Sequence, residues 1–138
     1  MGDRKQEANW LGVAYKLDPN PSQTDLYNWG YANYQAGVYE AADSIFCNLY
    51  QTKYPDQIYG YLWCARTKTA KDTTMQSEDI VPAYEKLAEM AMKVDSGKYK
   101  TQAVQALITL TTIANDVKKD SKSALTYIDR ILAIDPAN

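Results

Sequence analysis

The chain has 138 residues, a net charge of −2 and an apolar fraction of 46%, so a single domain of this length can bury a hydrophobic core. A weakly acidic chain lacks the basic surface that neutralises the phosphates of nucleic acid, and we expect no nucleic-acid partner. The longest apolar stretch, residues 103–114, is short and interrupted by threonines, so we expect no membrane span.

The composition also argues against catalysis. The chain contains no histidine, which is the usual general base and the commonest metal ligand. The glycines form no phosphate-binding loop, and the serines lie in neither a G-x-S-x-G nor an S-x-x-K motif. We therefore expect no enzymatic activity, no metal site and no cofactor. Cys47 and Cys64 lack the spacing of metal ligands, and we interpret them as small buried apolar residues in preference to a disulfide.

Apolar residues recur three and four positions apart along the chain, which predicts helices and no strands. Ser22 and Asp25 have the spacing of a capping box at the start of the second helix. Pro82 fits the first turn of the fifth helix, where its missing N–H does little harm. The predicted helices cover residues 3–17, 22–37, 38–52, 56–70, 78–94 and 98–117, and a seventh helix ends at 133.

Three stretches follow one spacing pattern. The first reads Leu26-x2-Trp29-Gly30-x2-Asn33, then Ala42-x3-Phe46, then Pro55. The second reads Gly60-x2-Trp63-Cys64-x2-Thr67, then Ala83-x3-Leu87, and the third reads Ile108-x2-Thr111-Thr112-x2-Asn115, then Ala124-x3-Ile128, then Pro136. This pattern resembles the tetratricopeptide repeat. The resemblance implies an all-α fold, an α-α superhelix of about seven antiparallel helices in one domain. It divides the chain into half a repeat (3–21) and three repeats (22–55, 56–96 with a long loop between its helices, and 97–138).

The ends of the chain and one internal stretch carry further family features. The chain begins with what resembles the second helix of a repeat, bearing Trp10, Leu11 and Val13, and it closes on IDPAN, which in the family leads into another repeat. We therefore expect the natural protein to be longer. The stretch YPDQIYGYLWCA resembles repeat proteins of Bacteroidetes, many of which are exported. That resemblance favours the cell envelope over the cytoplasm, provided that a signal peptide has been removed.

A tryptophan followed by a small residue occurs twice, as Trp29-Gly30 and Trp63-Cys64, 34 residues apart. In tetratricopeptide repeats a small residue at this position lets the two helices of a pair approach closely. The resemblance therefore implies that Gly30 faces Ala42 and that Cys64 faces Ala83 in the next unit. The tryptophans are expected to fill the space beside these contacts.

Tyrosines form the most distinctive surface pattern. Tyr27, Tyr31 and Tyr34 are four and three residues apart, so they share one face of the second helix. The packing stripe of that helix lies about 100° away, and in the family the tyrosine direction is the concave groove. Tyr61 and Lys68 would continue this groove in the next unit. Two interpretations stay open: the tyrosines pack between neighbouring repeats with wet hydroxyls, or they contact a ligand.

The first functional hypothesis is a non-catalytic scaffold that binds a partner protein or peptide segment in this concave groove. A glycan-binding surface of a cell-envelope protein is an alternative, because exposed aromatic faces also suit sugar rings. A purely structural solenoid segment is a third. The sequence indicates neither the identity of the partner nor the oligomeric state.

Overall fold

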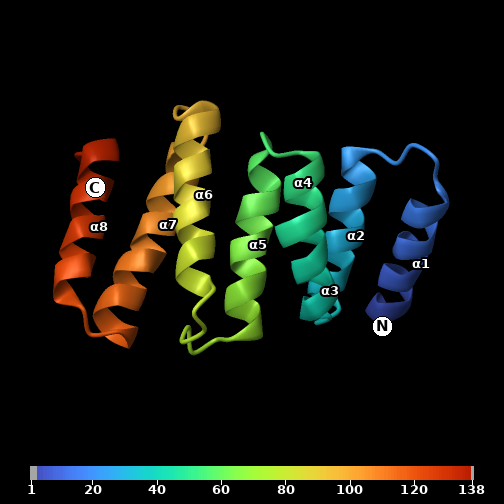
Figure 1. Ribbon diagram of the computed structural model, residues 1–138, viewed down its shortest axis with the longest axis horizontal. Coiled ribbons are helices and arrows are strands. Elements are labelled where there is room, and N and C mark those ends of the chain that lie inside the picture. The colour runs from blue at the N-terminus through green and yellow to red at the C-terminus, as the bar shows by residue number, and fades with distance from the viewer. Residues whose placement is uncertain (1–2, 138) are drawn as a thin grey trace. The chain divides into compact units, whose positions relative to one another are not determined.

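A computed structural model describes residues 3–137, and these residues form helices joined by turns, with no strand among them (Figure 1). The elements are α1 (Arg4–Leu17), α2 (Gln23–Gln35), α3 (Tyr39–Asp43), the π-helical segment η1 (Ser44–Tyr50), α4 (Gln51–Lys53), α5 (Ile58–Lys71), α6 (Ile80–Asp95), α7 (Lys100–Thr112), the π-helical segment η2 (Ile113–Val117) and α8 (Ser121–Ile134). Because α3, η1 and α4 are continuous and α7 continues into η2, the predicted all-α fold of seven helices is confirmed.

The helix starts are fixed by local capping. Ser22 Oγ accepts a hydrogen bond from the Asp25 N–H (3.0 Å), and an Asp25 carboxylate oxygen accepts one from the Ser22 N–H (2.9 Å), so the predicted capping box is present. At the start of α1 the Asp3 side chain accepts a hydrogen bond from the Gln6 N–H, and at the start of α8 the Asp120 side chain accepts one from the Ser123 N–H. Pro82 lies in the first turn of α6, as predicted.

The two π-helical segments were not predicted. A local change from i→i−4 to i→i−5 hydrogen bonding leaves no mark on the hydrophobic period, so the sequence carried no signal for it. In η2, for example, the Lys118 N–H donates to the Ile113 carbonyl at 2.9 Å. Such segments are frequent at functional sites. Segment η1 contributes to the core and to the surface of the first unit, because it carries Phe46, Cys47 and Tyr50.

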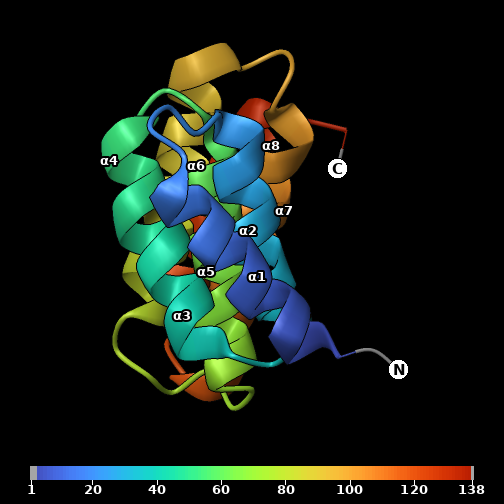
Figure 2. The same cartoon turned by 90° about the vertical axis from the view of Figure 1, so that its right-hand side faces the viewer.

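The chain consists of two compact units, Met1–Thr67 and Lys68–Asn138, with the boundary inside α5. In the first unit α1 lies alongside α2, as the two views agree (Figures 1 and 2). In the second unit α7 packs against both α6 and α8 (Figure 1). Each unit has its own buried apolar side chains. Those of the first include Leu26, Ile45, Phe46, Tyr50 and Ile58, and those of the second include Ile80, Leu87, Leu107, Leu110 and Ile113.

Gly30 lies where α2 approaches η1. A Cβ atom at this position would lie 2.6 Å from Cζ of Phe46 and 2.9 Å from Cγ2 of Ile45. The expectation of a close helix approach is therefore correct, but the nearest side chains belong to Phe46 and Ile45 and not to Ala42. The spacing pattern indicates that a small residue is needed without identifying the residue that occupies the freed space.

Cys47 of η1 and Cys64 of α5 form a disulfide, with their Cα atoms 4.8 Å apart and the two residues 17 positions apart in sequence. The interpretation of the cysteines as free apolar residues is wrong. Cysteine spacing alone does not reveal whether two helices bring the thiols together. The bridge fixes η1 to α5 beside the largest group of aromatic side chains in the first unit.

Gly30→Ala is expected to lower the free energy of unfolding by about 1–3 kcal/mol, because the added methyl group meets buried side chains. Alanine alone would favour the helix by about 1 kcal/mol, so a net loss reports on packing. Gly97→Ala is the control, since the nearest atom to a Cβ there is an Asp95 carboxylate oxygen at 3.7 Å. Urea denaturation measures both variants, and equal stability would contradict the close approach.

Replacing both Cys47 and Cys64 with alanine is expected to lower the free energy of unfolding by about 3 kcal/mol, because the bridge closes a short loop in the unfolded chain. Urea denaturation with and without reductant measures the effect. Reductant should bring the wild-type midpoint close to that of the double variant and leave the variant unchanged. Two reactive thiols in the unfolded, air-oxidised wild type would contradict the disulfide.

Candidate functional site

The predicted groove tyrosines are brought together by a tryptophan. The ring centroids of Tyr31, Tyr34 and Tyr27 lie 5.1, 5.2 and 6.2 Å from that of Trp63, with interplanar angles of 69°, 74° and 78°. Edge-to-face contact is a favoured arrangement of aromatic rings. All three tyrosines are half-buried. Tyr31 and Tyr34 therefore serve packing between α2 and α5, which supports the first of the two interpretations that the sequence left open.

Trp63 is held on its other sides as well. The Phe46 ring stacks on it with a centroid separation of 6.0 Å, and the Arg66 guanidinium lies 4.9 Å from the Trp63 ring centroid. Cation–π contacts of this kind contribute about 0.5–1 kcal/mol at exposed sites. Trp63 is thus the centre of an aromatic cluster drawn from α2, η1 and α5.

Two of the predicted groove residues lie elsewhere. Tyr61 is only 5% exposed, and its hydroxyl donates a hydrogen bond to the Pro55 carbonyl at 2.8 Å. It is therefore not part of an exposed surface, because the turn before α5 covers it. Lys68 is in the second unit, where its Nζ lies 3.0 Å from an Asp79 carboxylate oxygen. Helical spacing predicts that Tyr61 and Lys68 share the tyrosine face, but it does not reveal the hydrogen bond to Pro55 or the ion pair with Asp79.

A cavity opens beside Tyr27, and we call it the tyrosine cavity. It has a volume of about 370 Å³, which is in the range of small-ligand sites. Its lining comes from α2, η1 and the start of α5: Gln23, Thr24, Tyr27, Tyr50 and Tyr59. Tyr59 is 41% exposed, whereas Tyr50 is 1% exposed. The Tyr27 and Tyr59 rings meet edge to face at 6.1 Å.

Tyr50 provides a polar atom in an otherwise buried side chain. The Gln23 amide nitrogen donates a hydrogen bond to the Tyr50 hydroxyl at 3.0 Å. Burial, with smaller contributions from Tyr59 and Tyr54, raises the pKa of Tyr50 to about 12. The phenol is therefore neutral at physiological pH. Since its oxygen accepts from Gln23, its own proton can be donated to a further group.

The sequence identified only Tyr27 among the residues that line the tyrosine cavity. Tyr50 and Tyr59 were missed because they lie on other helices, and their approach to Tyr27 depends on how η1 and α5 pack. The one available signal was the high tyrosine content, 12 residues in 138.

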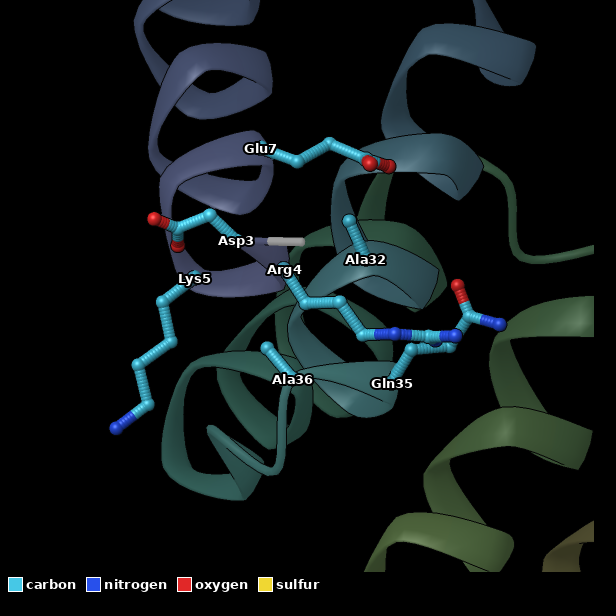
Figure 3. Close-up of a pocket in the computed structure, with 7 residues that line it drawn as sticks. All are labelled: Asp3, Arg4, Lys5, Glu7, Ala32, Gln35 and Ala36. Carbon is cyan, nitrogen blue, oxygen red and sulfur yellow. The ribbon is translucent and has the colours of Figure 1, made fainter. Parts of the chain in front are cut away.

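A larger cavity of about 800 Å³ lies between α1 and α2. Figure 3 shows Arg4 and Glu7 reaching toward α2, whereas Asp3 and Lys5 point away from it. All four of these charged side chains are exposed, so solvent screens them. The two acidic and two basic groups do not converge on one point, and this cavity is the weaker candidate for a specific site.

Metal binding and membrane insertion find no support within residues 3–137. No group of three or more histidine, cysteine, aspartate or glutamate side chains in this range could hold a metal ion. No helix that the structure describes is both long and apolar enough to cross a membrane.

The packed helices described above define the chain as an all-α protein. A solved structure has a similar fold: the C-terminal part of a tetratricopeptide-repeat-containing protein from Cytophaga hutchinsonii, a member of the Bacteroidetes. The two are 28% identical with a TM-score of 0.81, over 99% of this chain and 52% of that one. The present chain thus spans about half the length of that solved chain.

Neither protein-family models nor curated proteins give a match to the chain. The likeness to the solved structure nevertheless confirms the resemblance that the sequence motifs indicated. The chain therefore has a tetratricopeptide-like α-α fold.

Trp63→Ala is expected to lower the free energy of unfolding by about 3–5 kcal/mol, because it removes the ring on which Tyr27, Tyr31 and Tyr34 pack. Trp10→Ala is the matched control. Trp10 is 68% exposed, and its loss should change stability by no more than about 0.5 kcal/mol. Denaturation followed by far-UV circular dichroism measures both, and similar losses would contradict a central role for Trp63.

Proposed function

We propose that the chain is a non-catalytic scaffold that binds a segment of a partner protein at the tyrosine cavity. The observation that carries the proposal is the convergence of Tyr27, Tyr50 and Tyr59 on a neutral cavity with a hydrogen-bond donor in its wall. Aromatic side chains are typical anchors of protein interfaces, since they offer large contact areas with little conformational freedom to lose.

The proposed site is narrower than the groove inferred from the sequence. It keeps Tyr27, adds Tyr50 and Tyr59, and leaves Tyr31 and Tyr34 as supports that hold the Trp63 cluster in place. The division into half a repeat and three repeats belongs to the same proposal. In that division the tyrosine cavity lies where the first full repeat, residues 22–55, meets the helix that opens the next one.

A glycan is the competing ligand class, because a sugar ring can also stack on tyrosine. Sugar recognition needs several polar side chains to satisfy the ring hydroxyls, and the cavity supplies a single amide, that of Gln23, beside the hydroxyls. A protein segment makes fewer such demands and fits an aromatic anchor site better. We therefore favour a protein partner and keep the glycan as a possible outcome of the test.

Site-directed photocrosslinking tests the proposal. A benzophenone amino acid in place of the exposed Tyr59 should capture one protein from extracts of the source organism. The same group in place of the half-exposed Tyr127, in the second unit, is the control. Mass spectrometry then identifies the crosslinked segment, which can be made as a synthetic peptide.

Binding of that peptide should weaken by about 2 kcal/mol or more, roughly 30-fold, in Tyr59→Ala, because an anchoring ring is lost. Tyr127→Ala should leave it unchanged. Calorimetric titration measures both affinities, and thermal melting shows whether each variant is folded. Capture of the same proteins from both positions, or capture of a glycan alone, would overturn the proposal.

A further inference from the structure

We infer that the segment bound at the tyrosine cavity is proline-rich and adopts the polyproline II conformation, with a proline ring seated between Tyr27, Tyr50 and Tyr59. This inference names the ligand chemistry of the proposed site and rests on the proposed function. Three properties of the cavity carry it: the absence of charge in its lining, the orientation of its rings and the hydrogen-bond donors that it presents.

The lining is neutral. None of the five residues that form it carries a charge at physiological pH. The groups that perturb Tyr50 are other tyrosines and the Gln23 amide. The charge of Arg66 acts on Tyr27, but the Arg66 guanidinium lies over the Trp63 ring and does not line the cavity. A lysine anchor would lose hydration there without gaining a carboxylate partner in the lining, which is costly. An uncharged ligand group therefore fits this lining best.

The rings form a rigid, angular wall. Tyr27 and Tyr59 stand 75° apart with centroids at 6.1 Å, and Tyr27 is in turn fixed against Trp63 at 78°. Tyr50 is held by Tyr54 at a centroid distance of 5.4 Å. Preformed aromatic walls of this kind suit a stiff, flat apolar group. Polyproline II segments dock into aromatic-lined grooves for this reason, and they lose little entropy because they are already ordered.

The hydrogen-bonding groups favour a ligand rich in acceptors. The Tyr50 hydroxyl has a proton to donate, and the Gln23 amide uses one of its two N–H groups on Tyr50 and retains the other. A polyproline II segment makes no internal hydrogen bonds, so its carbonyls are available, and proline brings no N–H that would need an acceptor. A helical segment would already use its carbonyls internally. The proline-rich segment is thus the better match.

Calorimetric titration with capped decaproline tests the inference. The control probe is a capped decamer of alternating alanine and serine, which is also neutral and of equal length. Wild-type protein should bind decaproline at least about tenfold more tightly than the control, the effect of one good anchor. Tyr59→Ala should reduce decaproline affinity by about tenfold or more, whereas Tyr127→Phe should leave it unchanged.

Tyr50→Phe isolates the hydrogen bond, because it removes only the hydroxyl. It should weaken decaproline binding by about 2- to 10-fold, the usual contribution of one neutral hydrogen bond. Thermal melting verifies that the variant is folded, and the exposed Tyr59 supplies a second variant should it not be.

The outcomes separate this inference from the proposed function. If both decamers bind equally or neither binds, while the crosslinked partner peptide binds and responds to Tyr59→Ala, the proline-rich ligand is wrong and the scaffold proposal stands. If the partner peptide also fails to bind, both are wrong. Binding of cellohexaose that depends on Tyr50 and Tyr59 would overturn both in favour of a glycan site.

Discussion

The first unit depends on the close approach of α2 to η1 at Gly30. Because this residue has no side chain, the ring of Phe46 can occupy the space that a Cβ atom would need. From there Phe46 stacks on Trp63, and Trp63 in turn orients Tyr27 at the edge of the tyrosine cavity. The absence of a side chain at Gly30 therefore affects where Tyr27 lies at the edge of the cavity, because the rings of Phe46 and Trp63 connect the two.

How far the sequence predicts this structure depends on the range of the interaction. Helix bounds follow from hydrophobic period and from caps such as Ser22 with Asp25, all of which act within a few residues. The need for a small residue at Gly30 was also readable from a motif. The sequence did not predict the Cys47–Cys64 disulfide or the approach of Tyr50 to Tyr59, because each of these pairs joins separate helices. The π-helical turn in η1 adds a local shift that hydrophobic spacing does not record.

The departures from the repeat motif have a local explanation. The tetratricopeptide pattern W-x2-L-G-x2-Y has a tyrosine where this chain has Asn33 and Thr67, and both of these residues are buried. The Asn33 amide donates to the Trp29 carbonyl at 3.0 Å, and the Thr67 hydroxyl donates to the Trp63 carbonyl at 2.7 Å. Each polar group is thus satisfied one helical turn back, which removes the cost of burying it. Asn33 and Thr67 are therefore buried with a hydrogen-bond partner on their own helix.

The Cys47–Cys64 bridge also determines how the molecule responds to a break in its backbone. The residues between the two cysteines form a covalently closed ring, and both Tyr50 and Tyr59 belong to it. The turn that joins α4 to α5 includes the exposed Pro55 and Asp56, where a protease could cut. After such a cut the disulfide would still join the two fragments. The walls of the cavity would remain tethered across the break, as in a two-chain protein held by its cystine.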